Sequence, residues 1–165
     1  MSYTFTPMNK EDAQAIFSWH YDGQYATYDL QGELDDNSEL LDQRSPYYAV
    51  RDERGELVGF FCYGSAAAIQ GYNEPYLFSE DGSLLVGLGM RPDLTGKGTG
   101  VGFVQAGLAF ARRKFAPHRF RLFVLSWNER AIKVYEKVGF LRVRRVLQKN
   151  IHGEKEFIEM VMDAW

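Results

Sequence analysis

The sequence predicts an α/β fold in which helices cover both faces of a mixed β-sheet. Segments with helical spacing of apolar residues alternate along the chain with short apolar segments typical of strands. The 165 residues are 45% hydrophobic and 15% aromatic, which is enough for one full-sized core. Since no repeat, low-complexity tract or linker interrupts the chain, we expect a single domain over residues 1–165.

The N-terminal half predicts a strand, a helix and a pair of strands. Tyr3 to Thr6 reads as the first strand, and Asn9 caps a helix from about Lys10 to His20. Residues 21–33 hold three tyrosines, two glycines and two aspartates, a composition that fits either a ligand-binding loop or aromatic packing onto the core. A short helix at Glu39 to Gln43 and paired strands at 47–51 and 56–63 follow.

The middle of the chain predicts a strand followed by an amphipathic helix. Residues 71–82 read as a loop, and Ser83 to Met90 as a mostly apolar strand interrupted by Gly87 and Gly89. Glycines inside a strand indicate a bulge or the close approach of something else, here a ligand. Apolar residues at helical spacing predict a helix over 100–114.

The C-terminal part adds a strand, a helix and a hairpin. Arg119 to Leu125 reads as a strand, and Ser126 or Asn128 caps a helix from Glu129 to Val138 that ends at Gly139. Residues 140–149 and 155–162 form the hairpin around a turn at 150–153. This long hairpin offers an edge on which a homodimer can form.

Alternating glycines between strand and helix predict an anion-binding site. Gly96, Gly98, Gly100 and Gly102 lack a Cβ atom, so several backbone N–H groups can approach one ligand at the positive end of the following helix. The expected ligand is a phosphate or pyrophosphate. The spacing fits neither the mononucleotide P-loop, because Lys97 precedes glycine, nor the dinucleotide fingerprint.

The net charge of −3 conceals a division along the chain. Residues 1–90 hold 15 acidic against 4 basic side chains, whereas residues 91–165 hold 7 against 15. The basic half suits an anionic ligand, and the acidic half suits a cationic co-substrate such as an amine. The overall acidity argues against nucleic acid as a partner.

The other composition data exclude several classes of site. The chain begins with no signal-peptide pattern and has no apolar run long enough to span a membrane, so we expect a cytoplasmic protein without a membrane partner. Cys62, the single cysteine, lies in an apolar strand and is expected to be a buried thiol. The three histidines lack metal-ligand spacing, so no metal site is predicted.

A second motif lies in the helix after Ser126. Asn128 and Tyr135 are seven residues apart and project from the same side of the helix, with a phenol available as a proton donor. The glycine run after Met90, followed by Asn128, Ala131, Tyr135 and Gly139-Phe140, resembles the GNAT superfamily of acyl-CoA-dependent N-acetyltransferases. The two motifs span residues 84–140 in the order and at the separation found in that superfamily.

The resemblance implies acetyl-CoA as co-substrate and two parallel central strands, 83–90 and 119–125, that splay apart at a bulge within a mostly antiparallel sheet. The thioester would reach the sheet interior between these strands, and Tyr135 would protonate the departing thiolate as the catalytic residue. N–H groups of the strand near Met90 would stabilise the oxyanion. The residues implied in cofactor binding are Leu88, Gly89, Met90, Gly96, Lys97, Gly98, Thr99, Gly100, Val101 and Asn128.

The chain departs from the family pattern at two places. Thr95 stands where the glycine loop usually begins with Arg or Gln, which removes one side-chain contact and keeps the backbone cradle. Many relatives carry a glutamate base on one of the splayed strands, but this chain has Phe123 at the corresponding position. We assign the base to none of the nearby acidic residues, which are Asp22, Asp29, Glu33, Glu80 and Asp81.

Two function classes follow from these motifs. The first is an acetyl-CoA-dependent N-acetyltransferase that moves the acetyl group to a primary amine by direct attack in a ternary complex. The second is a noncatalytic acyl-CoA-binding or regulatory module, motivated by the missing glutamate. Polyamines, amino sugars and peptide N-termini are all possible acceptors, and we expect residues 21–33 to make the choice.

Overall fold

The computed structural model describes residues 2–32, 36–42, 46–68, 77–79, 81–150 and 153–165. Short 3-10 helices connect its regular elements. Two of them, η1 (Gly23–Tyr28) and η2 (Leu30–Gly32), lie in the tyrosine-rich residues 21–32, which we call the aromatic segment. In chain order the strands and α-helices are β1 (Thr4–Pro7), α1 (Lys10–Phe17), β2 (Tyr47–Arg51), β3 (Leu57–Tyr63), β4 (Ser83–Met90), α2 (Gly100–Phe115), β5 (Arg119–Leu125), α3 (Glu129–Val138), β6 (Leu141–Asn150) and β7 (Gly153–Asp163).

These strands form one sheet in the order β1-β2-β3-β4-β5-β7-β6. All neighbouring strands are antiparallel except β4 and β5, which are parallel. The prediction of a mixed, mostly antiparallel sheet with two parallel central strands is therefore confirmed. None of the helices in the described residues is long and apolar enough to cross a bilayer.

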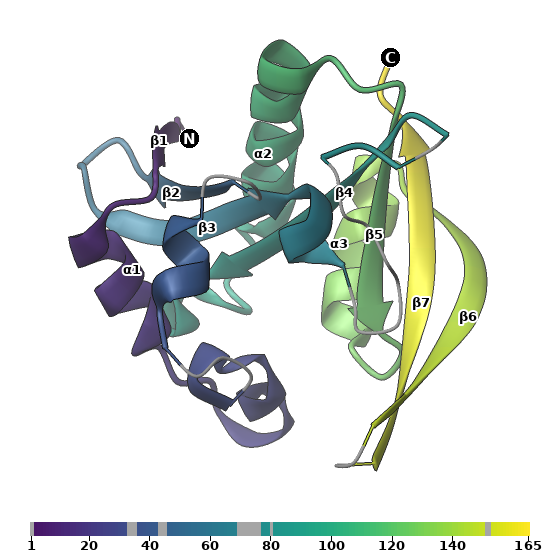
Figure 1. Ribbon diagram of the computed structural model, residues 1–165, viewed down its shortest axis with the longest axis horizontal. Helices are drawn as coiled ribbons and strands as arrows, with labels where there is room; N and C mark the ends of the chain where they lie inside the picture. Colours follow the sequence, from purple (N-terminus) through teal and green to yellow (C-terminus); the bar gives the residue numbers. More distant parts are fainter. Residues whose placement is uncertain (1, 33–35, 43–45, 69–76, 80, 151–152) are drawn as a thin grey trace.

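The two parallel strands separate soon after they begin. Their pairing covers only Ser83 to Leu85 on β4 and Arg119 to Arg121 on β5. Beyond this point β4 stays paired with β3 and β5 stays paired with β7, and Figure 1 shows the two arrows diverging. The predicted splay is confirmed, and it leaves one edge of β4 without a neighbouring strand.

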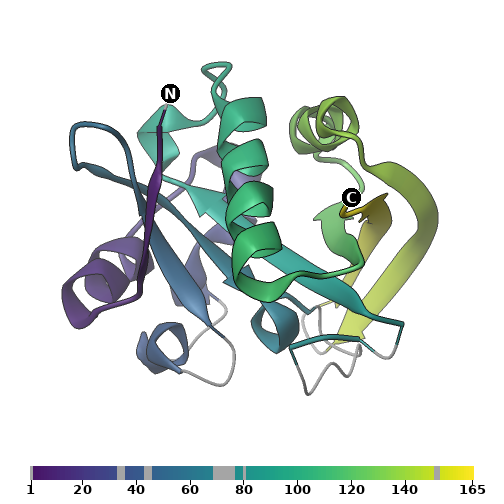
Figure 2. The same cartoon turned by 90° about the horizontal axis from the view of Figure 1, so that it is seen from above.

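Helices cover both faces of the sheet, as the alternating pattern of β3 requires. Phe61 points toward α2 and packs with Phe103 and Leu108 in one apolar cluster. Phe60 points to the opposite face and packs with Ile16 of α1 in a second cluster. Figure 1 shows α2 and α1 on opposite sides of β2 and β3, and Figure 2 shows α2 and α3 from above.

A side-chain cap sets the start of α1, and a turn of the backbone sets its end. Asn9 caps α1 by accepting from the Asp12 amide at 2.8 Å, as predicted. The helix ends at Phe17 rather than at the predicted His20, because the amide of Ser18 bonds back to Ala15 and the chain then turns so that the Trp19 ring packs against Phe60.

The two glycines of β4 do not mark a bulge, contrary to the expectation from the sequence. The β3–β4 ladder runs without a register shift from Tyr63 opposite Val86 to Gly59 opposite Met90. A Cβ atom on Gly87 would lie 2.6 Å from the Cys62 sulfur, and one on Gly89 would overlap the Phe60 ring. These glycines therefore make room for side chains of the neighbouring strand, and it is these side chains that approach closely.

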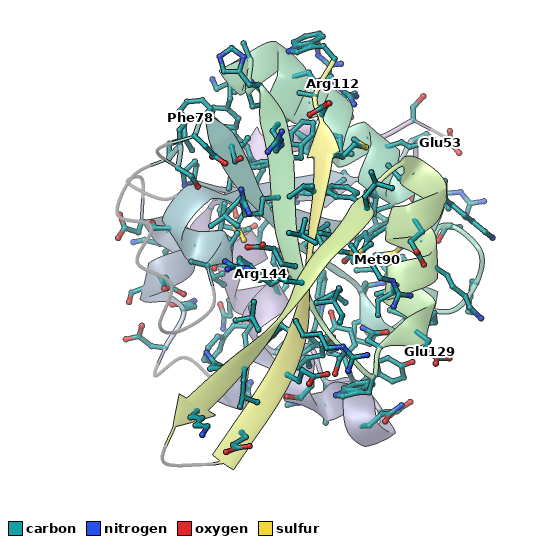
Figure 3. The ribbon with its side chains drawn as sticks, turned by 90° about the vertical axis from the view of Figure 1, so that its right-hand side faces the viewer. Glu53, Phe78, Met90, Arg112, Glu129 and Arg144 are labelled. Carbon is teal, nitrogen blue, oxygen red and sulfur yellow. The ribbon has the colours of Figure 1, made fainter. Side chains whose placement is uncertain are left out.

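A buried carboxylate holds the C-terminal strands together. Glu159 of β7 is 1% exposed and is paired with Arg121 of β5 at 3.0 Å and with Arg144 of β6 at 3.1 Å. Figure 3 labels Arg144 on β6 near its crossing with β7. Because two guanidinium groups compensate one buried charge, Glu159 links β7 to both of its neighbouring strands.

The hairpin of β6 and β7 ends the sheet. β6 is the last strand in the order, and its edge carries the exposed apolar side chains of Leu141, Val143 and Leu147. An edge strand presents unpaired backbone groups to a second chain. The homodimer expected at this hairpin stays a prediction.

The helix α2 packs closely on the sheet at Gly107, and a substitution there can test this packing. Its carbonyl accepts from the Tyr63 hydroxyl at 2.9 Å, and a Cβ atom there would overlap the Phe61 ring. We expect Gly107→Ala to lower the free energy of unfolding by about 1 to 3 kcal/mol, although alanine is the better helix former. Urea unfolding followed by circular dichroism measures the change.

Gly102→Ala in the same helix is the matched control. A Cβ atom at Gly102 meets no atom within 4 Å, so this variant should be as stable as the wild type or more stable by up to about 1 kcal/mol. Equal stability of the two variants would contradict the close packing of α2 on β3.

Candidate functional site

A cavity of about 750 Å³ passes through the gap between β4 and β5. On β4 it is lined by every residue from Val86 to Met90, and side chains at alternate positions of a strand point to opposite faces. Val86 and Leu88 pack in the cluster on the α2 side, whereas Gly87 contacts the α1 side. The cavity therefore connects the two faces of the sheet.

The glycine loop lies at the α2 end of this cavity. Gly96 has φ +73° and Gly98 has φ +81°, conformations that favour glycine. The first hydrogen bond of α2 runs from the Phe103 amide to the Thr99 carbonyl. Among the described residues no protein acceptor bonds to the backbone amides of residues 96–102, and the amides of residues 100–102 lie in the first turn of α2, where the helix offers them no acceptor. The loop therefore has the free N–H groups and the helix dipole expected of an anion site.

The structure brings most of the predicted site residues together. The cavity is lined by Leu88, Gly89, Met90, Gly96, Gly98, Gly100, Val101, Asn128 and Tyr135. Lys97 and Thr99 are outside this lining, and the Lys97 side chain is exposed beside the loop. Thr99 would therefore contact a ligand through its backbone, and Lys97 would contact it through its backbone or by extending its side chain.

The free edge of β4 directs peptide groups into the gap. The Arg91 amide bonds to the Val58 carbonyl, so in this antiparallel ladder alternate residues turn toward β3, and Leu88 and Met90 turn toward β5. The Tyr21 hydroxyl donates to the Met90 carbonyl at 2.6 Å and confirms this direction. Burial and the nearby Asp29 carboxylate raise the pKa of Tyr21, so its hydroxyl keeps the proton that it donates.

Asn128 has a structural role at the start of α3. Its side-chain oxygen accepts from the Ala131 amide at 3.2 Å, which makes Asn128 rather than Ser126 the helix cap. Its side-chain nitrogen donates to the Tyr28 hydroxyl at 2.8 Å. Since both ends of this buried amide have protein partners, direct cofactor binding by Asn128 stays a prediction.

Tyr135 lies two turns further along α3 and reaches the cavity. Its ring packs on Phe140 with centroids 6.0 Å apart, and its hydroxyl has no hydrogen-bond partner among the described residues. Burial raises the pKa of Tyr135, and the neighbouring Tyr28 phenol adds to the rise. The Tyr135 side chain therefore presents a protonated hydroxyl to the cavity at neutral pH.

Sequence reasoning missed the residues that join the aromatic segment to α3. The Arg130 guanidinium stacks over the Tyr25 ring at 4.2 Å, and its Nη1 would lie 3.1 Å from a Cβ atom on Gly96. Trp127 contacts the rings of Tyr25 and Tyr28. The clustering of tyrosines in residues 21–33 was the only signal in the sequence, and it did not indicate which surface they contact.

The charged side chains in the described lining of the cavity come from one helix. Among the described residues, the charged side chains that line it all belong to α3, and they are Glu129, Arg130, Lys133 and Lys137. Acidic side chains of the N-terminal half have partners elsewhere, since Asp29 binds the Tyr21 amide and His20, and Asp81 binds Arg121. The basic side chains in the lining come from the basic half of the chain, and the pairing of the acidic half with a cationic co-substrate stays a prediction.

The two strands that border the gap supply no general base. Phe123 lines the gap where many relatives would have glutamate, and neither β4 nor β5 contains a carboxylate. Asp22 does not line the cavity, and Glu33 and Glu80 lie outside the described residues. Among the described residues no group of three or more potential ligand side chains is placed to hold a metal ion.

Comparisons with known proteins agree with this geometry. A curated relative, the mycothiol acetyltransferase of Salinispora tropica, is 30% identical over 135 residues, which make up 79% of this chain and 39% of that protein. The chain therefore spans about two fifths of the length of this relative.

Solved structures share the fold. A spermidine N-acetyltransferase chimera from Vibrio cholerae and hSSAT has a TM-score of 0.76 at 16% identity, covering 99% of this chain and 96% of that one. The aminoglycoside acetyltransferase AAC(6')-Ib in complex with coenzyme A has a TM-score of 0.71 at 20% identity, covering 98% and 95%. The family model described as the acetyltransferase (GNAT) family matches residues 10–140, so this chain belongs to the acetyltransferase (GNAT) family.

Proposed function

We propose that this protein transfers the acetyl group of acetyl-CoA to a primary amine. The observation that carries the proposal is the continuous cavity, which joins the free amides of the glycine loop to the Tyr135 hydroxyl through the gap between β4 and β5. Such a passage suits a long ligand with a phosphate group at one end and a reactive group at the other. Membership of an acetyltransferase family supports the same reading.

The described residues fit the pyrophosphate and the pantetheine arm of coenzyme A. The backbone amides from Gly96 to Val101 would hold the pyrophosphate, and a Cβ atom at Gly98 would point into open space, so the loop leaves room for it. Arg130, Lys133 and Lys137 supply positive charge beside the loop. The peptide groups of Leu88 and the N–H group of Met90 would pair with the amide groups of the arm, while the Met90 carbonyl stays bonded to the Tyr21 hydroxyl.

When bound, acetyl-CoA supplies an acetyl carbon activated as a thioester. The N–H groups of Leu88 and Met90 would stabilise the oxygen on which negative charge develops after attack by the amine. Tyr135 would donate its proton to the departing thiolate as the carbon–sulfur bond breaks. Because neither β4 nor β5 contains a carboxylate, we propose that water accepts the proton of the amine.

A noncatalytic acyl-CoA-binding module is the second candidate. The observation that favours it is the apolar Phe123 in the gap, where many relatives would have a base. This candidate keeps the role of the glycine loop and gives Tyr135 no chemical task. Release of coenzyme A from acetyl-CoA in the presence of an amine distinguishes the two candidates.

Gly98→Ala should weaken binding of coenzyme A by roughly five- to tenfold. An alanine at φ +81° is strained by about 1 kcal/mol, and the free loop can escape that strain by leaving the binding conformation. Calorimetric titration with coenzyme A measures the affinity. Gly55→Ala, at φ +81° and also in open space, adds the same strain in the turn between β2 and β3 and should leave the affinity unchanged.

Tyr135→Phe should lower kcat by roughly 100-fold with little change in the affinity for coenzyme A, because it removes the proton donor and keeps the ring on Phe140. Thiol release from acetyl-CoA measures the rate. Tyr3→Phe is the control, since Tyr3 packs on Phe103 and does not line the cavity. Equal rates for Tyr135→Phe and the wild type would rule out Tyr135 as the donor.

The pH dependence of kcat gives an independent test of Tyr135. Because burial raises the phenol pKa above its ordinary value of 10.0, the active protonated form persists to higher pH. The rate should rise as the amine loses its proton and should not fall again below about pH 10. A pH–rate profile with a decline between about pH 8 and 10 would contradict the assignment.

A further inference from the structure

The end of the cavity opposite the glycine loop is apolar and aromatic. Its wall includes Ile16, Trp19, Leu30, Phe60 and Ala67, all of which pack in the cluster on the α1 side of the sheet. The basic residues of the lining all belong to α3, where Arg130 stacks over the Tyr25 ring. A ligand that enters from the α1 side therefore meets apolar surface before it reaches the gap.

Phe123 and the aromatic segment complete this wall. Phe123 alternates on β5 with Leu122 and Val124, which are buried in the cluster on the α2 side, so the Phe123 ring points to the α1 side. Tyr21 and Leu30, from either end of the aromatic segment, also line the cavity. The Tyr21 hydroxyl is already bonded to the Met90 carbonyl.

No described residue supplies this end of the cavity with a carboxylate. The one acidic residue in the described lining is Glu129, which lies on α3 together with Arg130, Lys133 and Lys137. On the α1 side, Asp12 is bound by Arg51 at 2.7 Å, and Asp29 is bound by His20 and by the Tyr21 amide. Neither Asp12 nor Asp29 lines the cavity, and both carboxylates already have partners within the protein.

We propose that the acceptor is a monoamine whose nitrogen is carried by an apolar or aromatic group. A second ammonium group of a polyamine would lose its water in this apolar pocket without gaining a negative partner among the described residues, which is unfavourable. An alkyl or aryl group would instead gain by leaving water and contacting Trp19, Leu30 and Phe60. This inference rests on the proposed acetyl transfer and specifies its acceptor.

The test compares amines that differ only in the second charge. Hexylamine and 1,6-diaminohexane have the same chain length, and 2-phenylethylamine adds an aromatic ring. With acetyl-CoA and the wild-type protein, we expect kcat/KM for hexylamine and 2-phenylethylamine to exceed that for 1,6-diaminohexane by at least tenfold. A diamine that reacts as well as hexylamine would overturn the inference.

Binding separates this inference from the proposed function. The same amines are titrated calorimetrically into the protein saturated with coenzyme A, and hexylamine should bind at least tenfold more tightly than 1,6-diaminohexane. If no amine is acetylated but this order of affinity holds, the catalytic proposal fails and the acceptor class stands. If 1,6-diaminohexane is acetylated and hexylamine neither binds nor reacts, the acceptor class fails and the catalytic proposal stands.

A placed carboxylate should reverse the preference. Leu30→Glu introduces an acid into the apolar wall and should shift the ratio of the two kcat/KM values toward 1,6-diaminohexane by at least tenfold. Leu41→Glu is the matched control, because Leu41 packs against the same cluster and does not line the cavity. An equal shift of the kcat/KM ratio in both variants would overturn the assignment of this wall to the acceptor. The comparison of the amines with the wild-type protein remains a test even if a variant does not fold.

Discussion

The short ladder between β4 and β5 is the constraint on which the site depends. The two strands share only three residue pairs, because each has a longer antiparallel ladder with its other neighbour. Beyond Leu85 and Arg121 the twist of the two halves carries the strands apart. On the free edge of β4, no described residue bonds to the peptide groups of Leu88 or to the Met90 N–H group, and these half-buried groups are left to bond to water or to another molecule. The separation of the strands thus leaves a demand for hydrogen bonds in the gap.

The Tyr21 hydroxyl shows how part of that demand is met within the chain. It donates to the Met90 carbonyl, and so the aromatic segment is anchored to the edge of β4. The same segment contacts α3 through Tyr25 on Arg130 and Tyr28 on Asn128. The aromatic segment therefore contacts both β4 and α3.

Local interactions explain which parts of the structure were predictable. The bounds of β4, β5 and α3 agree with the sequence pattern, because apolar periodicity, the Asn128 cap and Gly139 with φ +127° act within a few residues. The glycine loop was predictable for the same reason. Gly87 and Gly89 were misread, because the atoms that require their small size belong to β3, more than 20 residues earlier in the chain.

The sequence by itself determined most of the elements, the glycine loop before α2 and the pair of Asn128 and Tyr135 on one helix, since each depends on neighbours along the chain. Only the tertiary structure decided that acidic residues of the N-terminal half turn to partners such as Arg51 and His20, while the apolar side chains of α1, β3 and β5 line the far end of the cavity. The physical reason is that composition gives the number of charges, whereas packing decides which of them face a cavity and which are neutralised by residues distant in the sequence.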